Sequence, residues 1–202
     1  GTSGLWNLKL GAGHGITARD PDADPARASF TAMSFHSGGA GARPNKDGLS
    51  ATPFPSSVRN VPCEVLETVS PLVVWKKELR QDSGGPGKYR GGLGQTMVLG
   101  NREKAEFAIF ATFERVKNPA RGRDGGGSGA NGSLGLASGT KLRGMGRQVV
   151  PIGDRLVVHM PGGGGIGDAG ERDPAAVAAD VKAGYVSIKA AARDYGVDGG
   201  GD

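Results

Sequence analysis

Short apolar and β-branched runs, separated by long glycine-rich stretches, dominate the pattern of hydrophobic positions along this chain. Runs of this length bounded by Gly, Pro and Asp are typical of β-strands. In the fifth run, alternate positions place four apolar side chains on one face: Phe107, Ile109, Ala111 and Phe113. The pattern predicts strands at about 30–35, 63–67, 71–75, 95–99, 105–113, 147–150 and 154–159.

Helix signals appear only near the C-terminal end of the sequence. Asp173 is a natural N-cap before Pro174, and the helix that follows should end at Gly184. Ser187 should cap a second helix that ends before Gly196. The sequence therefore predicts an α+β fold with a β-dominated body, long glycine-rich loops and two short C-terminal helices.

These elements divide the 202 residues into four stretches. We expect a leading segment at 1–29, a β-rich body at 30–170, a helical tail at 171–197 and a frayed end at 198–202. The leading segment has neither an initiator methionine nor the pattern of a signal peptide. We expect the chain to begin in the middle of a longer protein.

Glycine accounts for 38 of the 202 residues, far above the average usage of roughly 7%. The stretch 78–95 is the most informative because its glycines alternate with fixed charges. A flexible linker would lack these charges, and a packed strand would not tolerate so much glycine. The stretch predicts a turn with unusual φ/ψ angles that is held in place by ion pairs. The turn should lie beside a group that needs close approach of the backbone, as in a binding site or its wall.

The formal charge of +5 raises the possibility of a nucleic-acid partner. Most basic residues stand next to acids, however, and aromatic residues make up only 5% of the chain. A mixed solvated surface is favoured, with no nucleic acid and no membrane as partner. The single cysteine, Cys63, excludes an internal disulfide and suits a reducing, cytoplasmic compartment; we expect it to be buried and inert.

The sequence contains no complete motif for binding a nucleotide or a metal ion. Gly87-Lys88 is followed by Tyr89 where a phosphate loop needs Ser or Thr, and residues 168–173 separate the glycines at 162–167 from the next helix. The three histidines are far apart, so no metal site is predicted from these residues alone. His159 should be packed or hydrogen-bonded, and the Ser83 hydroxyl should cap its turn.

A dense polar set among Gly and Pro remains, and arginine in a rigid loop suits binding of a carboxylate, phosphate or carbonyl oxygen. The alternative is a structural lattice of ion pairs that shapes the long loops, and both interpretations stay open. No catalytic role follows from either. The candidates for the wall of a substrate site are His36, Arg43, Asp47, Arg59, Asn60, Arg80, Asp82 and Arg90.

Five groups of motifs occur in fixed order: 38–43 with 47–48, 60–67, 78–85 with 89–94, 161–168 with 171–173, and 180–187 through 194–197. Together they resemble the C-terminal part of hydantoinase B proteins, which include the B portion of 5-oxoprolinase and related subunits of acetone and acetophenone carboxylases. The likeness runs from about residue 30 to 197. Cys63, where an aliphatic residue is usual, and the Asp168-Ala-Gly170 turn depart from the family pattern.

The resemblance implies part of the B-type subunit of an ATP-dependent cyclic-amide hydrolase, acting on hydantoin or 5-oxoproline with an ATP-binding A-type subunit. ATP and Mg²⁺ are expected on that partner, a divalent metal is expected in an N-terminal part that this sequence lacks, and none is expected to bind these residues alone. One alternative is a subunit of an ATP-dependent ketone carboxylase. Another is an assembly or scaffold segment without catalytic residues.

Overall fold

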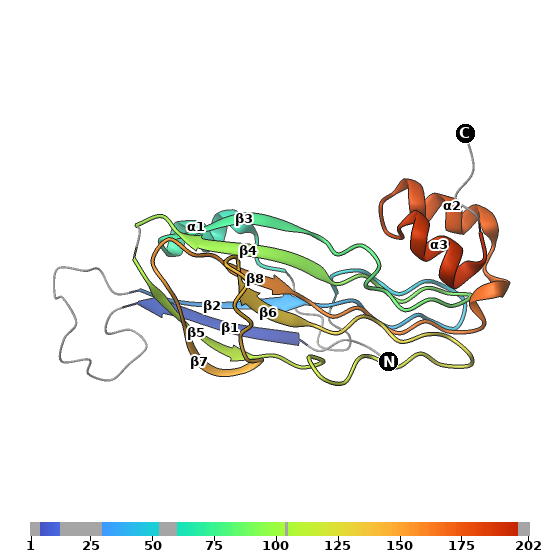
Figure 1. Cartoon of the computed structure of the whole chain (residues 1–202), viewed down its shortest axis with the longest axis horizontal. Helices are drawn as coiled ribbons and strands as arrows, with labels where there is room; N and C mark the ends of the chain where they lie inside the picture. Colours follow the sequence, from blue (N-terminus) through green and yellow to red (C-terminus); the bar gives the residue numbers. More distant parts are fainter. Residues whose placement is uncertain (1–4, 13–29, 53–59, 104, 198–202) are drawn as a thin grey trace.

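A β-sandwich and a pair of helices occupy opposite ends of an elongated molecule, with glycine-rich segments running between them (Figure 1). This arrangement comes from a computed structural model, which describes residues 5–12, 30–52, 60–103 and 105–197. The predicted frayed end at 198–202 lies outside the described residues, as does most of the leading segment.

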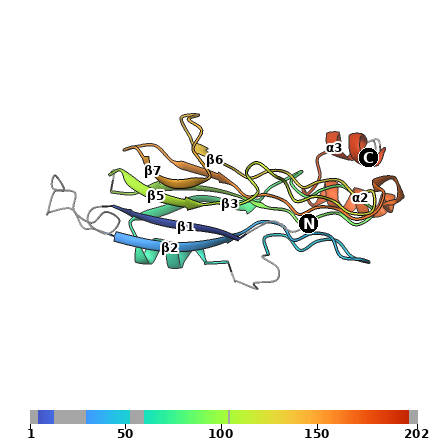
Figure 2. The ribbon, with the colours of Figure 1, turned by 90° about the horizontal axis from the view of Figure 1, so that it is seen from below.

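Two antiparallel four-stranded sheets form the sandwich (Figure 2). The first sheet has the order β2-β1-β5-β7, with β1 at Leu5–Ala12, β2 at Phe30–Ser37, β5 at Phe107–Thr112 and β7 at Met145–Val150. The second has the order β3-β4-β8-β6, with β3 at Leu72–Leu79, β4 at Gln95–Asn101, β8 at Leu156–His159 and β6 at Ser133–Leu136. Both sheets are completed by pairings between strands distant in sequence.

The core lies between the two sheets and follows the two-residue period of their strands. The predicted apolar face of β5 is confirmed, because Phe107, Ile109 and Ala111 are all buried in the core. Met97 and Leu99 of β4 face them from the second sheet, and Leu134, Leu136, Leu156 and Val158 complete that side. Burial of these side chains is the main hydrophobic stabilisation of the sandwich.

The strand predicted at 63–67 is wrong, because these residues form the short helix α1, Cys63–Val69. The helix contacts β2 and β3 and covers one open side of the sandwich, with Leu66 as its one buried side chain. A short alternation of apolar and charged residues does not distinguish a strand from one helical turn. Cys63 is consequently the first residue of a helix and half-buried, where the sequence predicted a buried strand position.

Two strands were not predicted. β1 lies in the middle of the first sheet, between β2 and β5, although its sequence shows only one short apolar patch. β6 lies inside the stretch 116–139, which the sequence predicts as a glycine loop. Only four residues form it, so its pairing with β8 rather than its composition defines it as a strand.

Both predicted helices are confirmed. Helix α2, Pro174–Lys182, begins after Asp173, whose carboxylate accepts a hydrogen bond from the Ala175 N–H. Helix α3, Ile188–Tyr195, is capped by the Ser187 hydroxyl and ends at Gly196 in the left-handed conformation, φ 66°. Local capping chemistry thus fixes the ends of both helices.

Between the sandwich and the helices, extended segments that are neither helix nor strand pack side by side; we call them the glycine bundle (segments 38–42, 83–87, 90–94, 120–130 and 161–166). Residues 161–166 are its central segment, which exchanges backbone hydrogen bonds with the others. The bonds include Gly39 N–H to Pro161 O (3.0 Å), Gly163 N–H to Gly92 O (2.9 Å), Gly85 N–H to Gly163 O (2.8 Å), Ala42 N–H to Gly164 O (2.9 Å) and Gly165 N–H to Gly127 O (2.9 Å).

Along the central segment, the neighbouring segment that each glycine faces recurs after three residues. A Cβ on Gly162 or on Gly165 would collide with the backbone of segment 83–87, whereas a Cβ on Gly163 would collide with Ala40 and one on Gly164 with Arg121. Each of these contacts would be shorter than 3.0 Å. A repeat of three is that of the extended polyproline II helix, and exclusion of every side chain resembles the crowded axis of collagen.

The stretch 78–95 therefore owes its glycines to close packing. The predicted close backbone approach is confirmed by the contacts of Gly84, Gly91 and Gly92 with neighbouring carbonyl groups. The unusual φ/ψ angles predicted for this turn are found at Asp82, whose φ is 57°, whereas Gly84, Gly91 and Gly92 do not have positive φ.

We predict that Gly163→Ala lowers the free energy of unfolding by about 3 kcal/mol or more, because the new methyl group meets backbone atoms that cannot rotate away. Denaturant unfolding of both proteins measures the difference. Gly170→Ala is the matched control, since a Cβ there meets only the Asp168 carboxylate at 3.4 Å. Equal stability of the two variants would show that the bundle is not closely packed.

Candidate functional site

Four charged side chains form a closed network, here called the ion cluster, where the glycine bundle meets the helical tail. Arg172 binds Asp47 through two parallel hydrogen bonds, Nη1 to Oδ1 (2.8 Å) and Nη2 to Oδ2 (2.7 Å). Arg90 binds Asp180 in the same way, Nε to Oδ2 (3.0 Å) and Nη2 to Oδ1 (3.2 Å). Arg172 Nη2 also donates to Asp180 Oδ2 (2.8 Å), so the two pairs are joined.

The ion cluster is largely shielded from water. Arg90, Arg172 and Asp180 are buried, and the tyrosine rings of residues 185 and 195 lie over the two guanidinium groups, at 5.4 Å from Arg90 and 5.9 Å from Arg172. Burial of Asp47 alone would raise its pKa, but the hydrogen bond and charge of Arg172 outweigh it and hold the pKa below its usual value. The carboxylate is therefore held in its charged form by its partners.

The same contacts attach the helical tail to the bundle. Arg90 comes from the bundle and Asp47 from the loop that follows its segment 38–42, whereas Arg172 and Asp180 come from the tail. Asp82 adds a second attachment, because its carboxylate accepts from the Ser187 N–H (2.7 Å) at the start of α3. Its backbone N–H also donates to the carbonyl of Tyr185 (3.0 Å). The charges thus join two parts of the fold.

Arg80 and Ser83 bind backbone groups where the sandwich leads into the glycine bundle. The Arg80 guanidinium donates to the carbonyls of Asn131 (2.7 Å) and Met160 (3.3 Å). The Ser83 hydroxyl donates to the Arg80 carbonyl and accepts from the Gly94 N–H (3.0 Å), which confirms its predicted role in capping the turn. Both side chains bind backbone groups and are engaged within the fold.

Arg43 and Asn60, two further predicted wall residues, bind backbone and side-chain groups of the fold. Arg43 is exposed and donates to the carbonyl of Asp47 (2.7 Å). The Asn60 amide donates to the Ala51 carbonyl (2.7 Å) and accepts from Gln95 (3.1 Å). Arg59 lies outside the described residues. A substrate-binding role for these residues stays a prediction.

His36 lies on β2 inside the sandwich, away from the ion cluster. Within the described residues, neither of its two buried ring nitrogens has a hydrogen-bond partner, and the same holds for the buried hydroxyls of Ser34 and Ser37. Burial, with a smaller contribution from the charge of Lys77, lowers the pKa of His36 to about 3. The imidazole is therefore neutral at physiological pH. His159, in contrast, is hydrogen-bonded to the Thr96 hydroxyl (3.0 Å), as predicted.

The groups of the described chain that most resemble parts of a nucleotide site have partners inside the fold. Lys88, which follows Gly87, pairs with Glu171 (3.0 Å), and many glycine N–H groups of the bundle already bind carbonyls of neighbouring segments. No group of three or more His, Cys, Asp or Glu side chains in the described residues could hold a metal ion. No step of a reaction can be assigned to ATP or a metal here.

Sequence reasoning missed Arg172 and Asp180, which complete the ion cluster. Arg172 stands between two acids and was therefore assigned to a mixed surface. Its partner Asp47 is 125 residues away, and Arg90 and Asp180 are 90 residues apart. The spacing of residues within a short stretch of sequence cannot predict pairs that are so far apart. The family resemblance was the available signal, because both missed residues fall within its motifs.

Two solved structures share the fold of this chain. Acetone carboxylase in its nucleotide-free form aligns with 98% of the chain (TM-score 0.72, 24% identity), and ATP-dependent caprolactamase from Pseudomonas jessenii aligns with all of it (TM-score 0.71, 23% identity). The chain covers 30% and 36% of these two proteins. At this identity the likeness establishes the fold.

Sequence comparison gives the family. The model of the hydantoinase B/oxoprolinase family matches residues 9–169, and the chain belongs to that family. A relative from a Pseudomonas species, described as the putative B component of a D-/L-hydantoinase, is 31% identical over 175 residues, which is 82% of this chain and 29% of the relative. The resemblance found in the sequence motifs is thereby confirmed, and the chain spans less than a third of that relative.

The helices give one further result. Among the described residues, no helix is both long and apolar enough to cross a lipid bilayer.

We predict that Arg172→Met detaches the helical tail, because it leaves two carboxylates near one remaining arginine; breaking a buried ion pair costs about 3–5 kcal/mol. Hydrogen exchange should show faster exchange in α2 and α3 with little change in β4 and β5. Arg193→Met is the matched control, since Arg193 is exposed and pairs with its neighbour Asp194. Equal protection of the tail in both variants would contradict a clamping role.

We also predict that acid destabilises the sandwich through His36. Between its folded pKa of about 3 and its ordinary value of 6.5, the unfolded chain binds a proton that the folded chain does not. Stability therefore falls as the pH decreases through this window, by about 2 kcal/mol from pH 8 to pH 5. Denaturant unfolding at several pH values should show a shallower dependence for His36→Leu. His159→Gln is the histidine control and should keep most of the slope; equal slopes for His36→Leu and wild type would refute the assignment.

Proposed function

We propose that this chain is part of the B-type subunit of an ATP-dependent hydrolase of cyclic amides, which works with an ATP-binding A-type subunit. The family match over residues 9–169 is the observation that carries the proposal. It is supported by the relative described as a hydantoinase component and by the fold shared with ATP-dependent caprolactamase. Hydantoin, 5-oxoproline and other lactams are the substrate class.

Within such an enzyme, we assign the described residues a positioning role. The ion cluster neutralises its own charges, and the glycine bundle commits its backbone groups to internal hydrogen bonds. A body of this kind holds the helical tail at a fixed distance from the sandwich. ATP and Mg²⁺ then belong to the partner subunit, and a divalent metal to residues beyond this sequence. This local contribution is compatible with the scaffold role that the sequence left open as an alternative.

A second candidate is a subunit of an ATP-dependent ketone carboxylase. The specific observation in its favour is the fold shared with acetone carboxylase over nearly the whole chain. This candidate differs in its substrate and in its need for bicarbonate. Because the similarity to acetone carboxylase and to caprolactamase is nearly equal, with TM-scores of 0.72 and 0.71, the fold does not favour one reaction.

We predict that the full-length parent subunit, purified with its A-type partner, releases ADP when hydantoin or 5-oxoproline is added. The same preparation with ATP alone, and with a ketone plus bicarbonate, provides the controls. Dependence of ADP release on the cyclic amide supports the proposal. Dependence on ketone and bicarbonate favours the carboxylase instead. If neither the cyclic amide nor the ketone with bicarbonate stimulates ADP release, the substrate assignment is overturned, while the family assignment is unchanged.

A further inference from the structure

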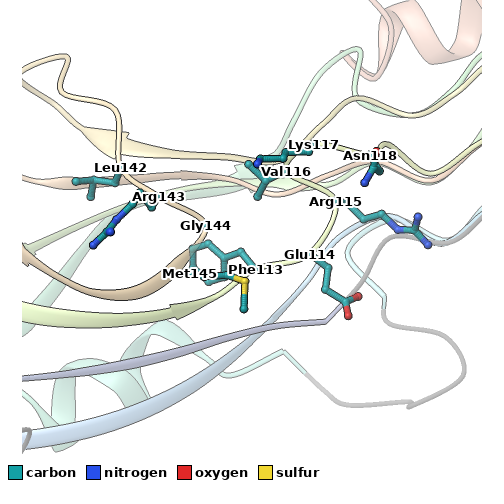
Figure 3. Close-up of a pocket in the computed structure, with 10 residues that line it drawn as sticks. All are labelled: Phe113, Glu114, Arg115, Val116, Lys117, Asn118, Leu142, Arg143, Gly144 and Met145. Carbon is teal, nitrogen blue, oxygen red and sulfur yellow. The ribbon is translucent and has the colours of Figure 1, made fainter.

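A surface pocket of about 820 Å³ lies on the side of the sandwich, between the segment that follows β5 and the segment that leads into β7 (Figure 3). Its volume is in the range of small-molecule sites, which is roughly 300–1,000 Å³. None of the predicted wall residues that the structure describes is among its lining residues. The lining residues are Phe113, Glu114, Arg115, Val116, Lys117, Asn118, Leu142, Arg143, Gly144 and Met145.

The middle of the pocket is apolar. Phe113 is buried in the core, and Val116 and Leu142 pack against that core. Met145 is 70% exposed, an unusually open position for a large apolar side chain. Figure 3 shows Phe113, Val116 and Met145 in the central part of the pocket. An apolar ligand group placed here would remove Met145 and its neighbours from water.

Backbone contacts hold both walls in place. The Phe113 N–H donates to the Gly144 carbonyl (2.9 Å), which joins one wall to the other. The Gly132 N–H donates to the carbonyl of Arg115 (2.9 Å), a residue with φ 59°. Non-glycine residues in this conformation often occur at functional sites. The walls are thus formed before any ligand arrives, which lowers the entropic cost of binding.

The charges around the apolar middle are mostly positive. Arg115, Lys117 and Arg143 stand against a single acid of the lining, Glu114. No hydrogen bond or ion pair involves the cationic groups of these three side chains within the described parts of the chain, whereas Glu114 has an interaction of its own. In Figure 3, Arg143 lies at one end of the pocket and Arg115 at the other. Each end therefore offers an uncompensated cation.

We propose that this pocket binds a small amphipathic carboxylate, with its hydrocarbon chain over Phe113, Val116 and Met145 and its anionic group against a cationic end. A guanidinium matches a carboxylate in charge and in planar geometry. A neutral ligand would leave the cations unused, and a cationic ligand would be repelled. The proposal stands on the pocket alone and does not depend on the proposed reaction.

The test is an NMR titration of the ¹⁵N-labelled chain with three probes that share one hydrocarbon chain: hexanoate, hexanol and hexylammonium. We expect hexanoate to shift the amide signals of Val116, Gly144 and Met145, and to bind about two- to five-fold more tightly than hexanol. Hexylammonium should bind most weakly. Equal affinity of the three probes, shifts confined to other parts of the chain, or no shifts would each overturn the proposal.

Variants separate the charge from the apolar contact. Lys117→Gln and Arg143→Gln should each weaken hexanoate binding by about two- to five-fold and leave hexanol binding unchanged. Arg143→Glu should reverse the preference towards hexylammonium. Lys46→Gln is the matched control, because Lys46 is also an exposed lysine but lies in the turn with Arg43 and is not part of the pocket lining. Loss of hexanoate binding in Lys46→Gln to the same extent would show a general charge effect and contradict the assignment.

Discussion

Hydrogen bonds between bare backbones, made by the central segment 161–166, are the interaction on which the rest of this structure depends. Glycine lets neighbouring segments approach until carbonyl and N–H groups meet directly, so buried polar groups find partners without a sheet or an α-helix. The cost is the large conformational entropy that each glycine loses on folding. The packing therefore depends on several neighbouring segments being present together.

The ion cluster depends on this packing for its geometry. Arg90 directly precedes Gly91, and Asp47 directly precedes Gly48, both of which lie against neighbouring backbones. The bundle therefore fixes where these two charges stand, and the tail supplies Arg172 and Asp180 to meet them. The cluster in turn gives the tail a specific position. In the sequence, charges of this kind are compatible with a binding site and with a structural lattice of ion pairs; in the structure these four charges pair with one another.

The sequence predicted the fold where the information is local. Capping residues such as Asp173 and Ser187 define both C-terminal helices, and alternating apolar positions define β5. Prediction failed where one short segment fits two conformations, as in α1, or where pairing with a distant strand decides, as in β1 and β6. The glycine content indicated close backbone approach, but it carries no information on which segments become neighbours.

The candidate residues divide in the same way. Asp47, Asp82 and Arg90 stood out because fixed charges among glycines are unusual, whereas Arg172 looked like ordinary surface. The pocket beside β7 gave no signal at all, because its lining combines common residue types from two segments that only the sandwich brings together. Long-range assembly, rather than local composition, creates both features.

The position of the central segment in the chain has a consequence for biosynthesis. Residues 38–42, 83–87, 90–94 and 120–130 leave the ribosome before residues 161–166, so they cannot complete their packing until the central segment has been made. Glycine-rich segments remain solvated during this wait and expose little apolar surface. β8 directly precedes the central segment, and it joins β4 to β6 in the second sheet. One late stretch of nascent chain therefore completes both the sheet and the bundle.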